Sequence, residues 1–440
     1  MSTDAQTGEV WAAHEPGVLR LARRVRCAAL SHDDGWLALG SSGGVRVVEL
    51  ETGRVAMQLR GAPVVGLGWL GREQLMVVRE PETGPCRAMV HAVPDGGLVS
   101  GAALAELNPM LCQVQCGAPG YDGEVSTVMV APARWHGGLR GSVRRRLGYT
   151  LSGPNWDAPV MLDPDALTVL PRLPSVRSAV AALSPDGQGY CLWLSEPDPK
   201  LGVNRPGTLL LVRDWRNPRP EVVCRVGRAL RAMRFTDASH LVLTGVDDDT
   251  PQARGELYVV DLFRRQVLLE RCANEIDLWP LGLPQVDVDP DGARALVVAG
   301  LGAGAPARRP TLGLEALDVT AGMTDGPPRP LRATMSVGAG AAWLDQGHDA
   351  VALFSATSLQ NLALTALASP AAAQPRDRGR QWDFALNGKA LEAPQITRSP
   401  AGRYLALTWR SRDARERGAA TDTLELALVP RDRLVALASG

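Results

Sequence analysis

The chain of 440 residues is 45% hydrophobic and 21% charged, which allows a large core and excludes a wholly disordered protein. Its 47 basic and 47 acidic residues give a formal net charge of zero, so charge provides no overall attraction to nucleic acid or to an anionic membrane. The seven scattered cysteines are typical of reduced thiols. Without a signal-peptide pattern or a long apolar segment, the sequence indicates a cytoplasmic bacterial protein.

The first repeat unit begins near Val25. Two apolar runs flank the polar turn Ser31-His32-Asp33-Asp34-Gly35, and the second of them ends at Leu39. Two more apolar runs follow and are separated by Glu51-Thr52-Gly53-Arg54. Short apolar runs between such turns predict β-hairpins, because Asp and Gly accept the backbone angles of tight reversals. Residues 25–59 therefore predict four consecutive strands.

The clearest copy of this hairpin is Ala181 to Leu194, where apolar runs flank Ser184-Pro185-Asp186-Gly187. Similar turns recur and can be aligned on the residue just before the turn. Most are 39 to 55 residues apart, and one gap of 114 residues leaves room for a diverged copy. The aligned residues are Leu30, Trp69, Leu183, Phe235, Val288, Trp343 and Arg398. The candidate strands of the diverged copy are Leu111 to Cys116, Val125 to Ala131, Leu147 to Leu151 and Val160 to Leu162.

A period of about 50 residues with four short strands predicts an all-β fold, a β-propeller of four-stranded blades. Each sheet has two apolar faces, and packing the sheets around a ring buries both. We predict eight blades, with seven as the alternative, in one domain of residues 18–440 after a polar lead-in of residues 1–17. The last blade has four candidate strands, Gln395 to Arg398, Tyr404 to Trp409, Thr423 to Val429 and Leu434 to Ala438, while Val18 to Ala22 is an alternative source of a closing strand.

Several strand ends resemble the repeats of WD40-like and TolB-like bacterial propellers. The segment Trp382 to Lys389 is similar to the Trp-Asp dipeptide and the following turn of WD40 repeats, and Val260-Asp261-Leu262 is a weaker version. Ser184-Pro185-Asp186-Gly187 and Asp289-Pro290-Asp291-Gly292 resemble the turns of both families. The Gly-His dipeptide that opens a WD40 repeat is missing at the expected places. The resemblance implies protein–protein interaction on a rigid disc, although a fold alone does not determine function.

Three local patterns are similar to known sites, and each is better explained as a turn. The spacing of Gly40, Ser42 and Gly44 matches a hydrolase nucleophile turn, but a β-type run follows where a helix is required. The segment Gly300 to Ala305 matches a dinucleotide-binding turn, but prolines follow it. The segment from Asp287 begins like a calcium loop, but Val298 stands where the bidentate Glu belongs. We therefore predict no catalytic residue, cofactor or metal.

Candidate partner-binding residues are charged or aromatic and lie in predicted loops. Arginines without interleaved aromatic residues favour an acidic protein or phosphate over nucleic acid. Trp beside Arg is typical of interface hot spots, so we expect the loop tryptophans to be exposed anchors. The candidates are Arg140, Arg144, Arg145, Arg146, Trp135, Trp156, Trp215, Trp279, Asp247, Asp248 and Asp249.

Two functions from different classes fit the sequence. The first is a non-catalytic scaffold for one or more partner proteins, a subunit of a bacterial multi-component regulatory or defence system. The second is a propeller enzyme or small-ligand sensor whose site lies at the mouth of the central channel, because such sites collect residues from several blades and leave no local motif. Charged side chains directed into the channel would favour the second function.

Overall fold

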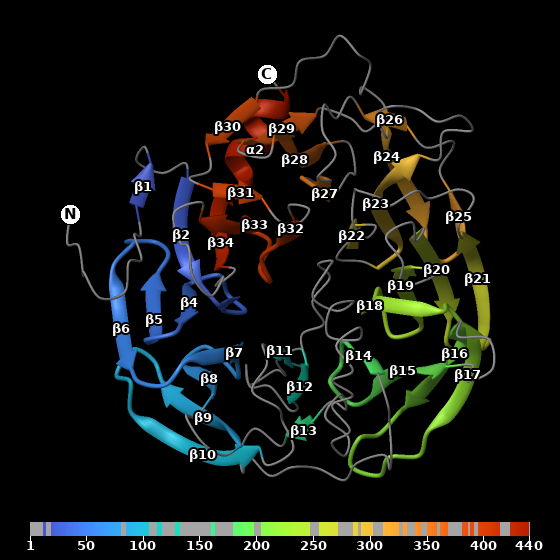
Figure 1. Cartoon of the computed structure of the whole chain (residues 1–440), viewed down its shortest axis with the longest axis horizontal. Helices are drawn as coiled ribbons and strands as arrows, with labels where there is room; N and C mark the ends of the chain where they lie inside the picture. Colours follow the sequence, from blue (N-terminus) through green and yellow to red (C-terminus); the bar gives the residue numbers. More distant parts are fainter. Residues whose placement is uncertain are drawn as a thin grey trace.

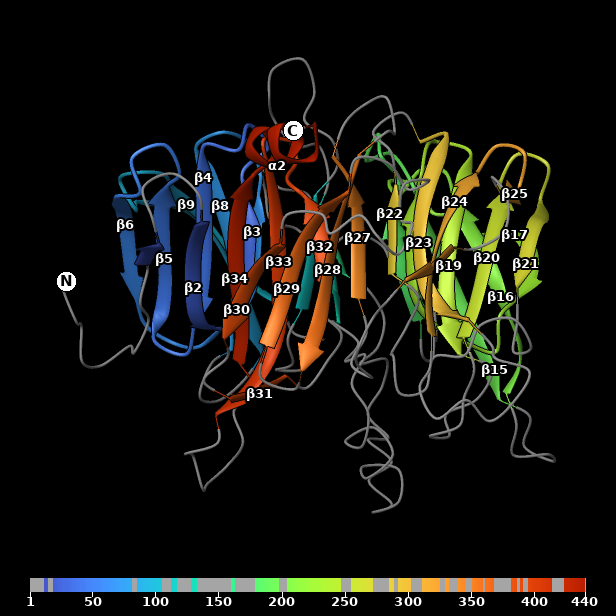
Figure 2. The same cartoon turned by 90° about the horizontal axis from the view of Figure 1, so that it is seen from above.

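The computed structural model arranges the chain as antiparallel β-sheets that follow one another around a ring (Figure 1). Figure 2 shows the same ring from its side, with the strands running between its two faces. These sheets confirm the predicted all-β propeller fold. The structure describes residues 12–14, 19–80, 85–104, 112–116, 128–132, 160–162, 179–197, 204–246, 255–271, 285–288, 292–301, 311–324, 329–331, 339–344, 350–358, 361–367, 381–385, 388–390, 395–413 and 423–439.

The first three sheets follow one another along the chain. Within each of them, neighbouring strands are consecutive in sequence and antiparallel, as expected for successive hairpins. The third sheet, which was predicted as the diverged copy, holds three described strands, and its candidate strand Leu147 to Leu151 lies outside the described residues. The strands are β3 (Cys27–Leu30), β4 (Trp36–Ser41), β5 (Gly44–Glu49), β6 (Val55–Arg60); β7 (Val64–Trp69), β8 (Gln74–Arg79), β9 (Cys86–Ala92), β10 (Leu98–Leu104); β11 (Cys112–Cys116), β12 (Val128–Pro132) and β13 (Val160–Leu162).

The next four sheets repeat the same order of strands. One of them has a fifth described strand, β26, which pairs with β24 beside the path of the other four. The strands are β14 (Ala179–Leu183), β15 (Tyr190–Pro197), β16 (Asn204–Val212), β17 (Glu221–Val226); β18 (Ala229–Phe235), β19 (His240–Val246), β20 (Gly255–Asp261), β21 (Gln266–Arg271); β22 (Gln285–Val288), β23 (Arg294–Leu301), β24 (Thr311–Asp318), β25 (Met323–Thr324), β26 (Arg329–Leu331); β27 (Ala339–Trp343), β28 (Val351–Ser358), β29 (Asn361–Leu367) and β30 (Gln381–Ala385).

The last sheet joins the two ends of the chain. Its strand β2 pairs antiparallel with β34, with Arg20 opposite Leu428, so an N-terminal strand takes the outer position beside the C-terminal strand. This pairing bears out the alternative prediction, in which Val18 to Ala22 supplies the closing strand. The strands are β1 (Ala12–His14), β2 (Leu19–Val25), β31 (Gly388–Ala390), β32 (Gln395–Arg398), β33 (Tyr404–Asp413) and β34 (Thr423–Pro430).

The prediction of a strand at Leu434 to Ala438 is wrong, because these residues belong to helix α2 (Arg431–Ser439). A short apolar run does not by itself distinguish a strand from a helix. Here Asp432 lies in the first turn, where a carboxylate interacts favourably with the helix dipole. Leu434 is fully buried against the last two sheets. The outer strand position that these residues were expected to fill belongs to β2.

The hydrophobic core lies between successive sheets. Val47 of β5 and Leu75 of β8 share one buried cluster, and Leu39 of β4 and Leu428 of β34 share another. The second cluster joins the first and last sheets, so packing as well as strand pairing closes the ring. Each of the seven aligned residues, from Leu30 to Arg398, is the last residue of a strand. For the first six residues that strand is the first of its sheet, and for Arg398 it is β32, which pairs with β33. The repeat seen in the sequence is therefore the repeat of the fold.

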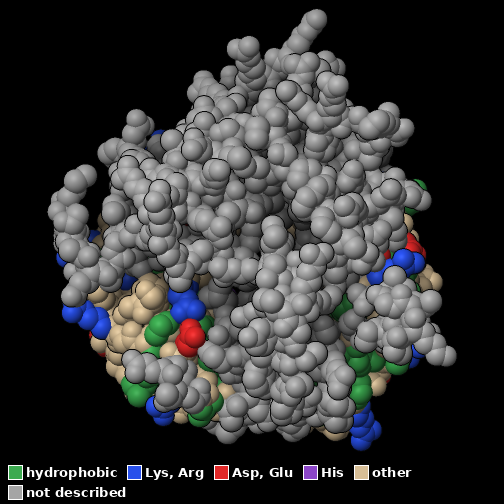
Figure 3. Space-filling model, viewed as in Figure 1, with side chains coloured by type: hydrophobic (Ala, Val, Ile, Leu, Met, Phe, Trp, Pro, Cys, Tyr) green, Lys and Arg blue, Asp and Glu red, His purple; other side chains and the backbone are tan. Residues whose placement is uncertain are grey.

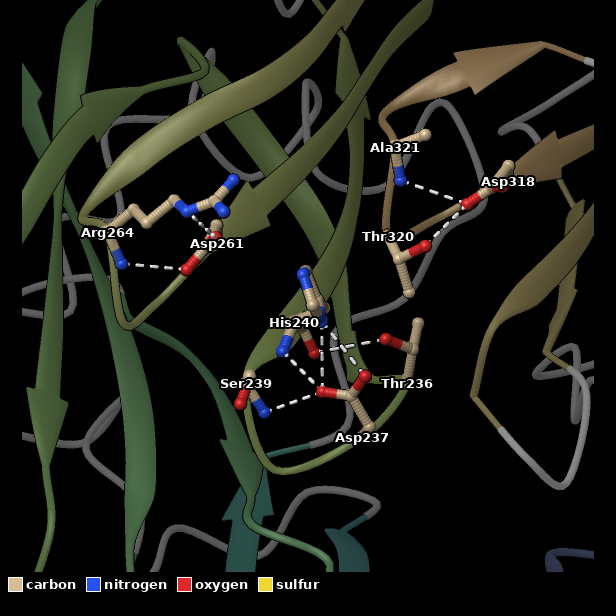
Figure 4. A network of polar contacts seen from close by, with 9 residues as sticks. All are labelled: Thr236, Asp237, Ser239, His240, Asp261, Arg264, Asp318, Thr320 and Ala321. Atoms are coloured by element: carbon tan, nitrogen blue, oxygen red, sulfur yellow. Dashed lines mark hydrogen bonds and ion pairs between the residues drawn. The ribbon is translucent and has the colours of Figure 1, made fainter.

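Short polar networks fix the turns on one face of the ring (Figure 4). The Asp318 carboxylate accepts hydrogen bonds from Ala321 N at 2.9 Å and Thr320 Oγ1 at 2.8 Å, and these bonds lower the pKa of Asp318. Asp261 Oδ1 likewise accepts a hydrogen bond of 2.7 Å from Arg264 N. A third such turn in Figure 4 consists of Thr236, Asp237, Ser239 and His240.

Candidate binding surfaces on the ring

Trp215 is the one sequence-predicted site residue within the described part of the chain. It is only 4% exposed, so the expectation of an exposed indole is wrong for this residue. Its Nε1 donates a hydrogen bond of 2.9 Å to Gly187 O, and the Arg216 guanidinium lies 4.3 Å from the centre of its ring. Trp215 therefore fastens one turn to another. The residues outside the described part are Arg140, Arg144, Arg145, Arg146, Trp135, Trp156, Trp279, Asp247, Asp248 and Asp249.

Three local patterns in the sequence were interpreted as turns. Where their residues belong to the described part of the chain, these residues form strands, a hairpin or contacts between sheets. Ser41 ends β4 and Gly44 begins β5, so the hydrolase-like spacing belongs to a hairpin, as predicted. The Asp287 carboxylate is bound to side-chain and backbone groups of other sheets, as detailed below. Gly300 lies on β23, whereas residues 302–305 are outside the described ranges. Within the described ranges, no group of three His, Cys, Asp or Glu side chains is placed to hold a metal ion.

A different aromatic residue is exposed on the outer part of the ring. Phe263, in the turn between β20 and β21, is 84% exposed and is followed by Arg264 and Arg265. Val222 of β17 is 58% exposed and Met323 of β25 is 65% exposed. These five residues come from three consecutive sheets, and we call them the rim patch.

Ion pairs and close packing hold the rim patch in place. Arg265, which has a φ of 57°, donates from Nη2 to Glu221 Oε2 at 2.5 Å and so ties the Phe263 turn to β17. Arg264 Nε lies 3.6 Å from Asp261 Oδ2 (Figure 4). On the other side of the patch, Gly322 has a φ of 62° and packs closely against Leu268 of β21. A Cβ atom added at position 322 would lie 2.5 Å from the Cβ of Leu268. These contacts connect the exposed side chains of the rim patch to the neighbouring sheets.

Three charged residues that influence one another electrostatically lie on strands that border the centre of the ring in Figure 1, and we call Arg234, Asp287 and Arg398 the central cluster. They lie on β18, β22 and β32. Arg398 Nη2 is 3.2 Å from Asp287 Oδ2, and the two side chains are 10% and 2% exposed. The same oxygen accepts a hydrogen bond of 3.1 Å from the backbone N–H of Trp343 on β27. One buried carboxylate thus links three consecutive sheets.

The period of two along a strand explains how these residues meet. Arg234 is the last residue but one of β18, and Asp287 is the last residue but one of β22. Arg398, in contrast, is the last residue of β32. Successive side chains of a strand point to opposite faces of the sheet. Arg234 and Asp287 therefore face the same way around the ring and Arg398 faces the other way, so Asp287 and Arg398 approach each other across β27.

The central cluster carries two guanidinium groups and one carboxylate. Burial raises the pKa of the Asp287 carboxyl, and the positive charges of Arg398 and Arg234 oppose that rise. The pKa of Arg234 is lowered because protein atoms surround the side chain and displace water, and Asp287 counteracts this effect. The surface of the Arg234 side chain is nevertheless exposed to solvent. We conclude that it is a charged group within reach of solvent, since guanidinium does not lose its proton in proteins.

Several thiols are unsuited to nucleophilic chemistry. Burial raises the pKa of Cys27 and Cys116 to about 12 and that of Cys224 to about 11. The Cys86 pKa is also raised to about 11, by burial and by the nearby Glu80. A thiol with such a pKa is protonated at neutral pH, and the thiol is a much weaker nucleophile than the thiolate. These cysteines lie in the hydrophobic core or pack against it.

On the face shown in Figure 3, the described surface includes both basic and acidic side chains among apolar ones. This mixture agrees with the formal net charge of zero for the whole chain. Among the described residues, no helix is long and apolar enough to span a membrane.

No protein-family model and no curated protein matches this sequence. The chain is similar in structure to Chaetomium thermophilum Sqt1 bound to the N-terminus of the ribosomal protein L10, with 10% identity, a TM-score of 0.54, and coverage of 93% of this chain and 97% of the other. A second crystal structure of Chaetomium thermophilum Sqt1 gives 9% identity and a TM-score of 0.54, with coverage of 93% of this chain and 96% of the other. The Dos1 propeller covers 75% of each chain, with 11% identity and a TM-score of 0.48. The similarity to Sqt1 supports the propeller fold.

Proposed function

We propose that this protein is a non-catalytic scaffold of eight blades that binds one or more partner proteins in the cytoplasm, as a subunit of a bacterial multi-component regulatory or defence system. The observation that carries the scaffold function is the rim patch, in which Phe263 is 84% exposed beside two arginines. Exposed aromatic residues next to Arg are the composition of interface hot spots. Transferring one Phe side chain from water into an interface contributes roughly 1.5–3 kcal/mol.

The frame of the patch favours binding without a large conformational change. The Arg265–Glu221 ion pair and the Asp261–Arg264 hydrogen bond fix the turn that presents Phe263. A side chain that is ordered before binding loses less conformational entropy when the partner arrives. Sqt1, a propeller of similar fold, has been solved with the N-terminus of a ribosomal protein bound. By analogy, we propose a protein segment as the partner here.

The loop residues identified from the sequence belong to the same proposal as further contact sites. The arginines at 140, 144, 145 and 146 would bind an acidic partner, and the tryptophans at 135, 156 and 279 would add apolar contacts. Asp247, Asp248 and Asp249 would face a basic partner. The alternative function, a propeller enzyme or ligand sensor, is favoured by one observation, the charged residues of the central cluster near the centre of the ring, two of which form a buried ion pair.

An affinity pull-down tests the scaffold function. The tagged full chain is compared with Phe263→Ala in lysate of its native cells, and Leu98→Ala is the matched control because Leu98 is 60% exposed on β10, in another sheet. We expect a stoichiometric partner protein with the unchanged chain and with Leu98→Ala, and a severalfold lower recovery with Phe263→Ala. Equal recovery from all three, or no stoichiometric partner, would contradict the proposal. Replacing Arg144, Arg145 and Arg146 with Ala tests the second surface in the same assay.

A further inference from the structure

The central cluster has one positive charge more than its own acid compensates. Arg398 is paired with Asp287 at 3.2 Å, and Asp287 Oδ2 also accepts the Trp343 N–H. Among the described residues, no acceptor is within hydrogen-bond or ion-pair distance of the Arg234 guanidinium, although Asp287 and Arg398 are near enough to act on it electrostatically. We propose that Arg234 is the anchor of a carboxylate-binding site at the centre of the ring, and that an acidic segment of a protein partner supplies the carboxylate.

The surroundings of Arg234 strengthen such a contact. Arg234 is exposed to solvent, so an incoming anion can reach it, and the nearby protein atoms that lower its pKa reduce the screening of its charge by water. Charge-assisted hydrogen bonds to guanidinium are among the stronger polar contacts in proteins, and the planar fork of Arg fits a carboxylate through two parallel bonds.

The charge balance favours a carboxylate over a phosphate dianion. One bound carboxylate neutralises the single excess positive charge of the cluster. A dianion would leave a net negative charge close to the buried Asp287 carboxylate, which would repel it. Ionised Asp, Glu and a chain terminus each carry one negative charge, so an acidic peptide segment supplies the appropriate group.

This inference rests on the proposed function only for the source of the carboxylate, and its test uses purified protein and synthetic peptides. The probe is fluorescein-labelled Gly-Gly-Glu-Glu-Gly-Gly amide, and its binding is followed by fluorescence anisotropy. The neutral Gly-Gly-Gln-Gln-Gly-Gly amide shows the contribution of the peptide backbone and the dye. The same Gln peptide with a free C-terminus shows whether a terminal carboxylate is sufficient. Sodium acetate and sodium phosphate serve as competitors.

We expect one or both carboxylate peptides to bind at least about tenfold more tightly than the neutral amide, a ratio that corresponds to one charge-assisted contact. Arg234→Gln should remove this preference and Arg234→Lys should restore part of it. The matched control is Arg87→Gln, because Arg87 is an exposed strand arginine of another sheet. Circular dichroism of each variant verifies the fold.

Four results would overturn the inference. These are equal binding of the charged and neutral peptides, a preference that survives Arg234→Gln, a preference that is also lost in Arg87→Gln, and stronger competition by phosphate than by acetate at equal charge concentration. Complete displacement by millimolar acetate would assign the site to free small carboxylates instead of a protein segment. The pull-down with Phe263→Ala depends on the rim patch alone, so failure of either proposal is recognisable separately.

Discussion

The Asp34 carboxylate accepts a hydrogen bond of 2.5 Å from Ser399 Oγ, although 365 positions separate the two residues in the sequence. The same carboxylate accepts hydrogen bonds from the backbone N–H groups of Ala401 and Arg403, at 3.2 and 2.9 Å. Asp34 is buried in the first turn of the first sheet, and the other three residues form the corresponding turn of the last sheet. One side chain therefore fastens the two sheets where the ring closes.

Breaking this contact should destabilise the protein. Asp34→Ala leaves three donors without their acceptor and places Ala at a φ of 55°, which Asp tolerates better. We expect the free energy of unfolding to fall by about 3 kcal/mol, as measured by urea denaturation. Asp34→Asn keeps one acceptor oxygen and should lose less. Asp95→Ala, at an exposed position, should change stability little, and an equal loss in this control would contradict the role of Asp34.

Removing one partner of the buried ion pair in the central cluster should strongly lower the free energy of unfolding. Arg398→Ala leaves the Asp287 carboxylate buried with its main counter-charge removed, so we expect a loss of about 3–5 kcal/mol in unfolding free energy. The double variant with Asp287→Ala should lose less than the two single variants added together, because no unpaired charge then remains. Strict additivity in this double-mutant cycle would show that the two groups do not interact.

The N-terminal strand should be required for a closed ring. Deleting residues 1–25 removes β1 and β2 and leaves the edge of β34 unpaired, and exposed strand edges promote aggregation. We expect a lower thermal midpoint and concentration-dependent light scattering. A chain that lacks only residues 1–11 keeps both strands and is the control. Unchanged stability and solubility in the longer deletion would exclude β2 as the closing strand.

The five described free cysteines should resist alkylation in the folded protein. Burial raises the pKa of the thiols of Cys27, Cys86, Cys116, Cys191 and Cys224, so the thiolate fraction at pH 8 is small. Treatment with iodoacetamide at pH 8, followed by mass spectrometry, should modify these positions far more slowly than in guanidinium chloride. Modification of any of them at the rate of the unfolded chain would contradict the raised pKa values of these thiols.

The repeat could be predicted from the sequence because it is local. The apolar runs and the Asp-Gly turns between them lie within a few residues of each other, and each aligned residue from Leu30 to Arg398 ends a strand. The C-terminal helix could not be predicted in this way. An apolar run such as Leu434 to Ala438 fits a strand and a helix equally, and the strand β2 that takes the outer place comes from the other end of the chain.

The surfaces were harder to predict because they depend on contacts between sheets. Trp215 follows a strand and was expected to be exposed, but its burial results from the distant turn at Gly187. The sequence pattern around Asp287 resembles the start of a calcium loop. Its ion-pair partner Arg398 is 111 positions later in the sequence, and no local spacing connects the two residues. The signal for the rim patch was present as Phe263 followed by two arginines within a polar turn.

Site-specific photo-crosslinking in native cells tests the scaffold function most directly. A benzophenone amino acid is introduced in place of Phe263 and, in a separate chain, in place of Leu98, which is similarly apolar and exposed on another sheet. If the rim patch binds a partner protein, irradiation should yield a discrete crosslinked species at position 263 and little or none at position 98. Equal crosslinking at the two positions, or no crosslinking at position 263, would contradict the proposal that the rim patch binds a partner protein.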